Sequence, residues 1–149
     1  MRIALGSDHG GLSLKKEIIK HLKSENIEIT DFGTHTEDSC DYPDYALKVS
    51  EEVVAGNFEL GILVCGTGIG VSICANKVPG IRAALCGDTF SAHATREHNN
   101  ANILTLGERT IGTGLAIDIV DTFINAKFLG ERHQRRIDKI TEIEKKYSK

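Results

Sequence analysis

The feature that most constrains the fold of this chain is an alternation of short apolar runs with longer amphipathic segments. The apolar runs lie at 2–6, 27–30, 60–65, 81–86 and 102–106, and their near-continuous hydrophobicity is typical of strands buried on both faces of a sheet. Between them, helical periodicity covers 11–24, 45–55, 70–77, 89–98 and 112–127, with Asp44 as the expected N-cap of the second helix. Strands separated by helices predict an α/β fold, a five-stranded parallel sheet with helices on both faces.

The length and charge of the chain exclude several other classes of protein. Its 149 residues show no linker or internal repeat, so we expect a single domain over 1–149. A net charge of −3 gives no support for nucleic acid or an anionic membrane as a partner. The first apolar run ends at Gly6, too short for a signal peptide, and no run reaches transmembrane length. We therefore expect a cytoplasmic protein whose four cysteines are reduced.

The last amphipathic segment, 132–147, differs from the others because its apolar stripe is narrow. The stripe consists of Ile137, Ile140, Ile143 and Tyr147 among many charged residues. A stripe of this width suits a helix that lies against another chain, which predicts a homodimer. Packing against its own domain fits the same stripe equally well.

Two turns that follow predicted strands contain the residues best suited to chemistry. Ligands of open parallel sheets bind beyond the carboxyl ends of the strands, which selects the turn at 8–11 and the segment from Cys65 to Ser72. Asp8 and His9 in the first turn are suited to bind a hydroxyl or a phosphate, or simply to cap the next helix. The turns at 87–88 and 106–108 offer less obvious chemistry.

The segment Cys-Gly-Thr-Gly-Ile-Gly at 65–70 has three alternating glycines, which allow several backbone N–H groups to point at one ligand. The start of the next helix adds a partial positive charge, so we expect an anion to bind there; tight packing is the simpler explanation of the glycines. The segment lacks the lysine of a P-loop, and Val71 stands where a dinucleotide motif requires glycine. A nucleotide is therefore a poor candidate.

Cys65 makes proton transfer the more interesting chemistry. A thiol at the start of a helix has its thiolate form favoured, and such a thiol can take a proton from carbon beside a carbonyl and return it. The neighbouring N–H groups would then stabilise an enediolate oxygen. The alternative is a small buried hydrophobic residue, which Cys74 and Cys86 fit well.

Basic residues near the carboxyl end offer a separate anion site. Arg132 and Arg136 are four residues apart and share a helix face, which suits a phosphate, although a solvated helix end explains them too. His9 and His98 show no metal-ligand spacing, so we expect no metal. The acidic net charge argues against nucleic acid here as well.

Together these segments resemble the type B ribose-5-phosphate isomerases over essentially the whole chain. The matching motifs are Gly-Ser-Asp-His-Gly-Gly at 6–11, Asp-Tyr-Pro at 41–43, Cys-Gly-Thr-Gly-Ile-Gly-Val-Ser-Ile at 65–73, Ala-Asn-Lys at 75–77, Gly-Ile-Arg-Ala-Ala at 80–84, Arg-Glu-His-Asn at 96–99 and Gly-Glu-Arg-His-Gln-Arg-Arg at 130–136. The resemblance implies a Rossmann-like domain, an enzyme of the pentose phosphate pathway without cofactor or metal, and a homodimer, or a tetramer, with sites built from both chains.

The resemblance also implies a role for individual residues. Cys65 would move the proton between C2 and C1, Thr67 would help proton exchange between the two oxygens, and His98 would open the furanose ring with Asp8 nearby. The remaining implied substrate contacts are the loop Gly66, Gly68, Gly70 and Ser72 as anion hole, His9, Arg132 and Arg136 for the phosphate, and Tyr42 and Asn99 as pocket walls. Because the cysteine is present, a variant that uses glutamate as base is not expected.

Reversible isomerisation of ribose 5-phosphate and ribulose 5-phosphate is the leading functional hypothesis. The same chemistry on allose 6-phosphate or galactose 6-phosphate is the nearest alternative; galactose enzymes of the family divide the site between two different subunits, whereas this chain has the whole set. A nucleotide-binding regulatory module is a third hypothesis, and it leaves Cys65, His98 and Arg136 unused.

Overall fold

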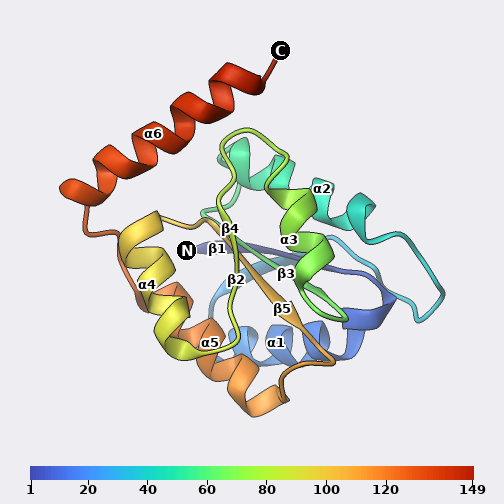
Figure 1. Ribbon diagram of the computed structural model, residues 1–149. Helices are drawn as coiled ribbons and strands as arrows, with labels where there is room; N and C mark the ends of the chain where they lie inside the picture. The colour runs from blue at the N-terminus through green and yellow to red at the C-terminus, as the bar shows by residue number, and fades with distance from the viewer.

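The computed structural model describes every residue from Met1 to Lys149 and shows a parallel sheet between two layers of helices (Figure 1). The strands are β1 (Arg2–Ser7), β2 (Glu28–Asp31), β3 (Leu60–Cys65), β4 (Ala83–Leu85) and β5 (Ile103–Gly107). The helices are the short 3₁₀ helix η1 (His9–Gly11), α1 (Leu12–Ser24), α2 (Tyr42–Val54), α3 (Ile69–Ala75), α4 (Thr89–Asn99), α5 (Thr113–Asn125) and α6 (Arg132–Tyr147). The predicted α/β fold with five parallel strands is confirmed.

The order of the strands, β2-β1-β3-β5-β4, explains which helices share a face of the sheet. Crossover connections between parallel strands are right-handed, so a helix changes face whenever the chain reverses its direction across the sheet. The chain moves outward from β1 to β2, returns past β1 to β3 and β4, and reverses again to β5. Accordingly α1, α4 and α5 cover one face, and α2 and α3 cover the other.

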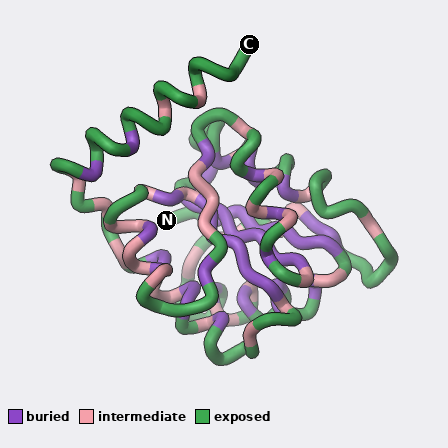
Figure 2. Tube along the Cα trace, in the orientation of Figure 1, coloured by how far each residue is buried: buried purple, intermediate pink, exposed green.

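The core consists of two apolar layers, one on each side of the sheet. Leu5, Ile62 and Phe123 are fully buried on the side of α1 and α5, whereas Val49 and Leu63 are buried on the side of α2. Figure 2 shows the buried strands at the centre and mostly exposed residues along α6. None of the helices is long and apolar enough to cross a membrane.

The second helix begins earlier than the sequence indicated. It starts at Tyr42 rather than at 45, with Asp41 at the N-cap, so the prediction of Asp44 as the cap was wrong. Pro43 lies in the first turn, where a missing N–H costs no hydrogen bond. The earlier start places Tyr42 on the helix, beside the carboxyl ends of the strands.

Helix α6 contacts the rest of the chain near its two ends. Ile137 and His133 are buried near its start, and the Glu144 carboxylate accepts the N–H of Gly80 at 3.1 and 3.2 Å near its other end. Ile143, between these contacts, is 60% exposed. Packing against its own domain therefore holds near both ends of the helix, and packing of the exposed part of the stripe on a partner stays a prediction.

Candidate functional site

The strand order has a switch point between β1 and β3, because the chain leaves β1 toward one edge and β3 toward the other. Ligands of such sheets bind at this point, beyond the carboxyl ends of the strands. The turn after β1 lies against the end of β3 there: a Cβ on Gly11 would stand 2.5 Å from the carbonyl oxygen of Val64. Only glycine allows so close an approach, which fixes the turn containing Asp8 and His9 against the turn containing Cys65.

In the first turn, Asp8 has the capping contact that the sequence allowed as its simpler role. Its Oδ1 accepts the Gly11 N–H at 3.1 Å, and the residue is nine-tenths buried. His9 is exposed, and its Nδ1 accepts the backbone N–H of Cys40 at 3.2 Å. This bond makes Nε2 the ring nitrogen of His9 that is available to a ligand.

Cys65 is the last residue of β3, and its side chain faces the layer of α2 and α3. It is 5% exposed, and its Sγ accepts the backbone N–H of Gly68 at 3.1 Å. Gly68 has φ +77°, and a Cβ there would lie 2.6 Å from Leu85 and 2.8 Å from the carbonyl carbon of Leu106. The loop therefore needs glycine at 68 in order to direct a backbone donor at the sulfur.

The rest of this loop is held in place by its own side chains and by Tyr42. The Thr67 hydroxyl accepts the Ile69 N–H at 3.2 Å while the residue stays exposed. A Cβ on Gly70 would lie 2.7 Å from the Tyr42 ring, so the ring packs directly on the backbone of the loop. Gly66 and Ser72 are half-buried in the same segment. We refer to Asp8, His9, Tyr42, Cys65, Thr67 and Ser72, with the glycines of 66–70, as the carboxyl-edge cluster.

Arg109 joins this cluster, and sequence reasoning missed it. The N–H groups of Glu108 and Arg109 donate to the carbonyls of Cys65 and Gly66 at 2.9 and 3.0 Å. A Cβ on Gly66 would stand 3.7 Å from Nε of Arg109, and this exposed guanidinium forms no ion pair within the chain. Its place just after β5 was a usable signal, because the same rule that selected Cys65 also applies to that turn.

The other predicted site residues lie at the amino ends of the strands. Helix α4 runs back along the sheet and ends at Asn99. The carbonyl of Asn99 accepts a hydrogen bond from Nε of Arg82, the residue just before β4. His98 stacks on His133 with ring centroids 4.4 Å apart and planes 16° apart. The pKa of His133 is lowered from its ordinary value by burial and by the neighbouring charges of His98, Arg132 and Arg136.

We refer to His98, Asn99, Arg132 and Arg136 as the amino-edge cluster. All four are exposed, and in Figure 1 α4 and α6 lie on the side of the sheet where β1 begins. Strand β5 spans the distance between the two clusters, and its five residues at roughly 3.3 Å each give about 16 Å. One chain therefore brings together the residues of each cluster but not the two clusters.

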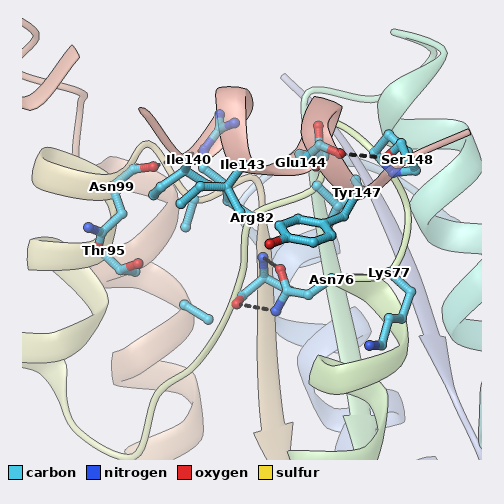
Figure 3. Close-up of a pocket in the computed structure, with 15 residues that line it drawn as sticks. Asn76, Lys77, Arg82, Thr95, Asn99, Ile140, Ile143, Glu144, Tyr147 and Ser148 are labelled. Atoms are coloured by element: carbon cyan, nitrogen blue, oxygen red, sulfur yellow. Dashed lines mark hydrogen bonds between the residues drawn. The ribbon is translucent and has the colours of Figure 1, made fainter. Parts of the chain in front are cut away.

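A large groove lies beneath α6, away from Cys65. It has a volume of about 760 Å³ and includes Arg82, Asn99, Ile140, Ile143 and Tyr147 in its wall. Figure 3 shows the apolar side chains of α6 over Arg82 and Asn76, with Asn99 at the side. The groove thus borders the amino-edge cluster. No three histidine, cysteine, aspartate or glutamate side chains lie together as a metal site would require.

Comparison with known proteins identifies the family. Residues 3–140 match the family described as Ribose/Galactose Isomerase. The chain is 46% identical to ribose-5-phosphate isomerase B of Escherichia coli over 145 residues, 97% of each chain. The solved ribose-5-phosphate isomerase B of Clostridium thermocellum is 59% identical with a TM-score of 0.98, over 99% of this chain and 100% of that one.

A second solved structure bears on the ligand. The ribose-5-phosphate isomerase B of Mycoplasma genitalium, solved with bound ribulose-5-phosphate, is 47% identical with a TM-score of 0.92, over 97% of this chain and 96% of that one. These similarities extend across both clusters and all the strands. The chain belongs to the ribose/galactose isomerase family.

Proposed function

We propose that this protein interconverts ribose 5-phosphate and ribulose 5-phosphate in the cytoplasm, without a cofactor. The observation that carries the proposal is the buried thiol of Cys65 at the switch point of the sheet, with the Gly68 N–H directed at its sulfur. This chemistry fits the full-length similarity to the type B isomerase whose structure was solved with bound ribulose-5-phosphate.

The reaction requires one base and a site for negative charge. Cys65 removes the proton from C2 of the open-chain aldose, and the electrons of that C–H bond form the enediolate. Backbone N–H groups of the loop 66–70 and the nearby Arg109 guanidinium stabilise the negative oxygen. The proton then returns to C1 to give the ketose, while Thr67 helps proton exchange between the two oxygens.

The substrate is too short to reach both clusters of one chain. From C1 to phosphorus it has six bonds of about 1.5 Å, so its length cannot exceed about 9 Å, against the separation of about 16 Å along β5. We infer that a second copy supplies the amino-edge cluster. In this arrangement Asp8, His9 and Tyr42 come from the chain that provides Cys65, and Asn99, Arg132 and Arg136 come from its partner, with the two arginines on the phosphate.

Exposed apolar residues flank each half of the site, as a dimer would require. Ile69 and Ile73 are 51% and 59% exposed on α3, beside Cys65, and Ile140 and Ile143 are 47% and 60% exposed on α6, beside the arginines. A two-fold axis that brings one half onto the other also covers both surfaces. The partner's His98 would then lie near Asp8, placed to open the furanose ring.

The test is the interconversion of the two pentose phosphates by purified protein in EDTA. Replacing the base should lower kcat by about 10²- to 10⁴-fold in Cys65→Ala, with folding and assembly unchanged. Cys74→Ala is the matched control, because this half-buried thiol of α3 packs at the border of the apolar layer and its hydrogen-bond partner is the carbonyl of Pro43. Full activity in Cys65→Ala would exclude Cys65 as the base. If the parent protein is inactive on pentose phosphates but active on allose 6-phosphate or galactose 6-phosphate, the substrate assignment is wrong.

A further inference from the structure

Two arginines hold the turn that follows His98. Arg82 donates from Nε to the carbonyls of Asn99 and Asn100 at 2.9 and 3.1 Å, and from Nη2 to Asn100 at 3.0 Å. Arg96 donates from Nη1 to Oδ1 of Asn100 at 3.2 Å and to the carbonyl of Ala101 at 2.6 Å. We call Arg82 and Arg96 the arginine clamp.

The end of α4 already has a cap without the hydrogen bonds of this clamp. Asn100 already caps α4 in the left-handed region with φ 46°, and its N–H donates to the carbonyl of Thr95. Neither arginine has a carboxylate within ion-pair distance. Burial lowers the pKa of both guanidinium groups; the charge of Glu144 partly offsets this for Arg82, and the charge of Arg82 lowers the pKa of Arg96 further. Keeping two like charges together at this turn is unfavourable, which indicates that the clamp has a function beyond ending the helix.

The clamped carbonyls lie beside two residues of the amino-edge cluster, His98 and Asn99. His98 directly precedes Asn99, and its own ring contact is the stack on His133. The backbone on its carboxyl side is fixed by the arginines, and Figure 3 shows Arg82 and Asn99 at the same groove. Without Arg82, the carbonyls of Asn99 and Asn100 would lose three hydrogen bonds to its guanidinium.

We propose that Arg82 is a positioning residue that fixes the backbone of Asn99 and Asn100 and thereby sets the place of His98 in the isomerase site. The inference rests on the proposed function, in which His98 opens the furanose ring. Arg82 itself does not contact the substrate. Its effect on the reaction must therefore pass through His98.

A double-mutant cycle separates this role from a general structural one. A misplacement of about 1 Å can cost up to about 10²-fold in rate, so Arg82→Gln should lower kcat/KM for ribose 5-phosphate at least about tenfold. In a His98→Asn background, Arg82→Gln should lower kcat/KM by less than about twofold, because the contribution of His98 is already lost. Arg2→Gln, an arginine paired with Glu28 at the same edge of the sheet, is the control that should leave activity unchanged.

A second measurement identifies the step. Ribulose 5-phosphate has its C5 oxygen phosphorylated and cannot close a furanose ring, so proton removal from its C1 by Cys65 needs no ring opening. Deuterium uptake at C1 in heavy water should stay close to the parent rate in Arg82→Gln and in His98→Asn, while conversion of ribose 5-phosphate falls in both. Arg82→Lys, which keeps the charge but loses the fork of donors, should resemble Arg82→Gln.

The following results would overturn the inference. One is an additive loss in the double mutant, and another is unchanged kcat/KM in Arg82→Gln. A third is sedimentation that shows both Arg82 variants as dissociated subunits, because Arg82 would then act through assembly of the dimer. A harmless His98→Asn would remove the ring-opening role of His98 and this inference with it, whereas the proposed isomerase function would still stand on Cys65→Ala.

Discussion

Cys65 and Cys86 are both buried thiols, yet their surroundings give them different properties. Sγ of Cys65 accepts a backbone N–H from the glycine loop. Cys86, at 2% exposed, lies in the apolar layer with Ala92 and Leu104. Burial, with a smaller contribution from the charge of Asp88, raises the pKa of Cys86 to about 11. Both residues stand at the carboxyl end of a strand, so the backbone donor at the sulfur, rather than residue type or position, distinguishes Cys65 from Cys86.

The raised pKa of Cys86 predicts a loss of stability in alkali. The folded state keeps this proton up to pH of about 11, whereas the unfolded chain releases it near its ordinary pKa of 9.0. Between these values the unfolded state binds fewer protons, so the free energy of unfolding falls as pH rises, by about 2 kcal/mol at pH 10.5 from this group alone. Urea unfolding followed by circular dichroism suits this chain, which has no tryptophan.

The variant that tests this prediction is Cys86→Ala. It should be less stable than the parent at pH 8, because it loses buried contacts. The difference in free energy of unfolding between the parent and this variant should be smaller by about 2 kcal/mol at pH 10.5. Cys40→Ala, in the loop before α2, should leave the pH dependence of the parent unchanged. An equal difference in free energy of unfolding at both pH values would show that Cys86 titrates alike in the folded and unfolded states.

At the scale of single residues, the sequence indicated that Asp8, His9 and Cys65 lie after buried strands, but it did not indicate Arg109. A cysteine, an aspartate and a histidine just after buried strands are visible in a linear chain, because the apolar runs show where the strands end. Arg109 lies over Gly66 only because the turn after β5 bonds to the turn after β3. That contact depends on the neighbour relation of the two strands, which apolar periodicity does not reveal.

Among the elements, strands were predicted more accurately than helix starts. A parallel strand buried on both faces is a run of apolar residues, and β3 has the same bounds in sequence and structure. The start of α2 was misplaced because Asp41 and Asp44 are both suitable caps, and Pro43 between them suits a loop as well as a first helical turn. The packing of α6 was ambiguous because one apolar stripe fits either kind of neighbour.

The exposed stripe of α6 predicts how a single charge would affect assembly. Ile143 is 60% exposed in the isolated chain, so Ile143→Asp should leave the fold of one chain intact. In a two-fold dimer the change occurs twice, and each lost isoleucine contact is worth about 1.5–3 kcal/mol. The dimer dissociation constant should therefore rise at least about a hundredfold, and isomerase activity should fall with it.

Sedimentation equilibrium with circular dichroism and an activity assay checks this prediction. Lys145→Asp, on the opposite side of α6 from Ile143, is the control and should remain an active dimer. A dimeric, active Ile143→Asp would mean that this stripe is not part of the interface. An unfolded variant would instead show that α6 stabilises its own chain.

For the whole molecule, the topology decides how a complete site can form. In a parallel sheet each helix runs opposite to the strands, so residues that follow a strand and residues that end a helix lie at opposite edges. Cys65 ends β3, while His98 and Asn99 end α4 and Arg132 and Arg136 begin α6 beyond α5. The two clusters cannot meet within one chain, which is the geometric reason for proposing a site shared between two copies.

A mixture of two inactive variants tests the shared site. Cys65→Ala disables the carboxyl-edge cluster and Arg136→Ala the amino-edge cluster, so each homodimer has two defective sites. If subunits exchange freely, about half of the dimers are mixed, and each mixed dimer has one site built from an intact Cys65 and an intact partner cluster. The mixture should therefore regain about a quarter of the parent activity.

Arg136→Ala mixed with His98→Asn should regain none, because both defects lie in the same cluster and every site receives one of them. Mass-tagged subunits show whether exchange has occurred. If the first mixture regains no activity although exchange is complete, Cys65 and Arg136 of one chain act in the same site. That result would contradict the separation of the two clusters along β5.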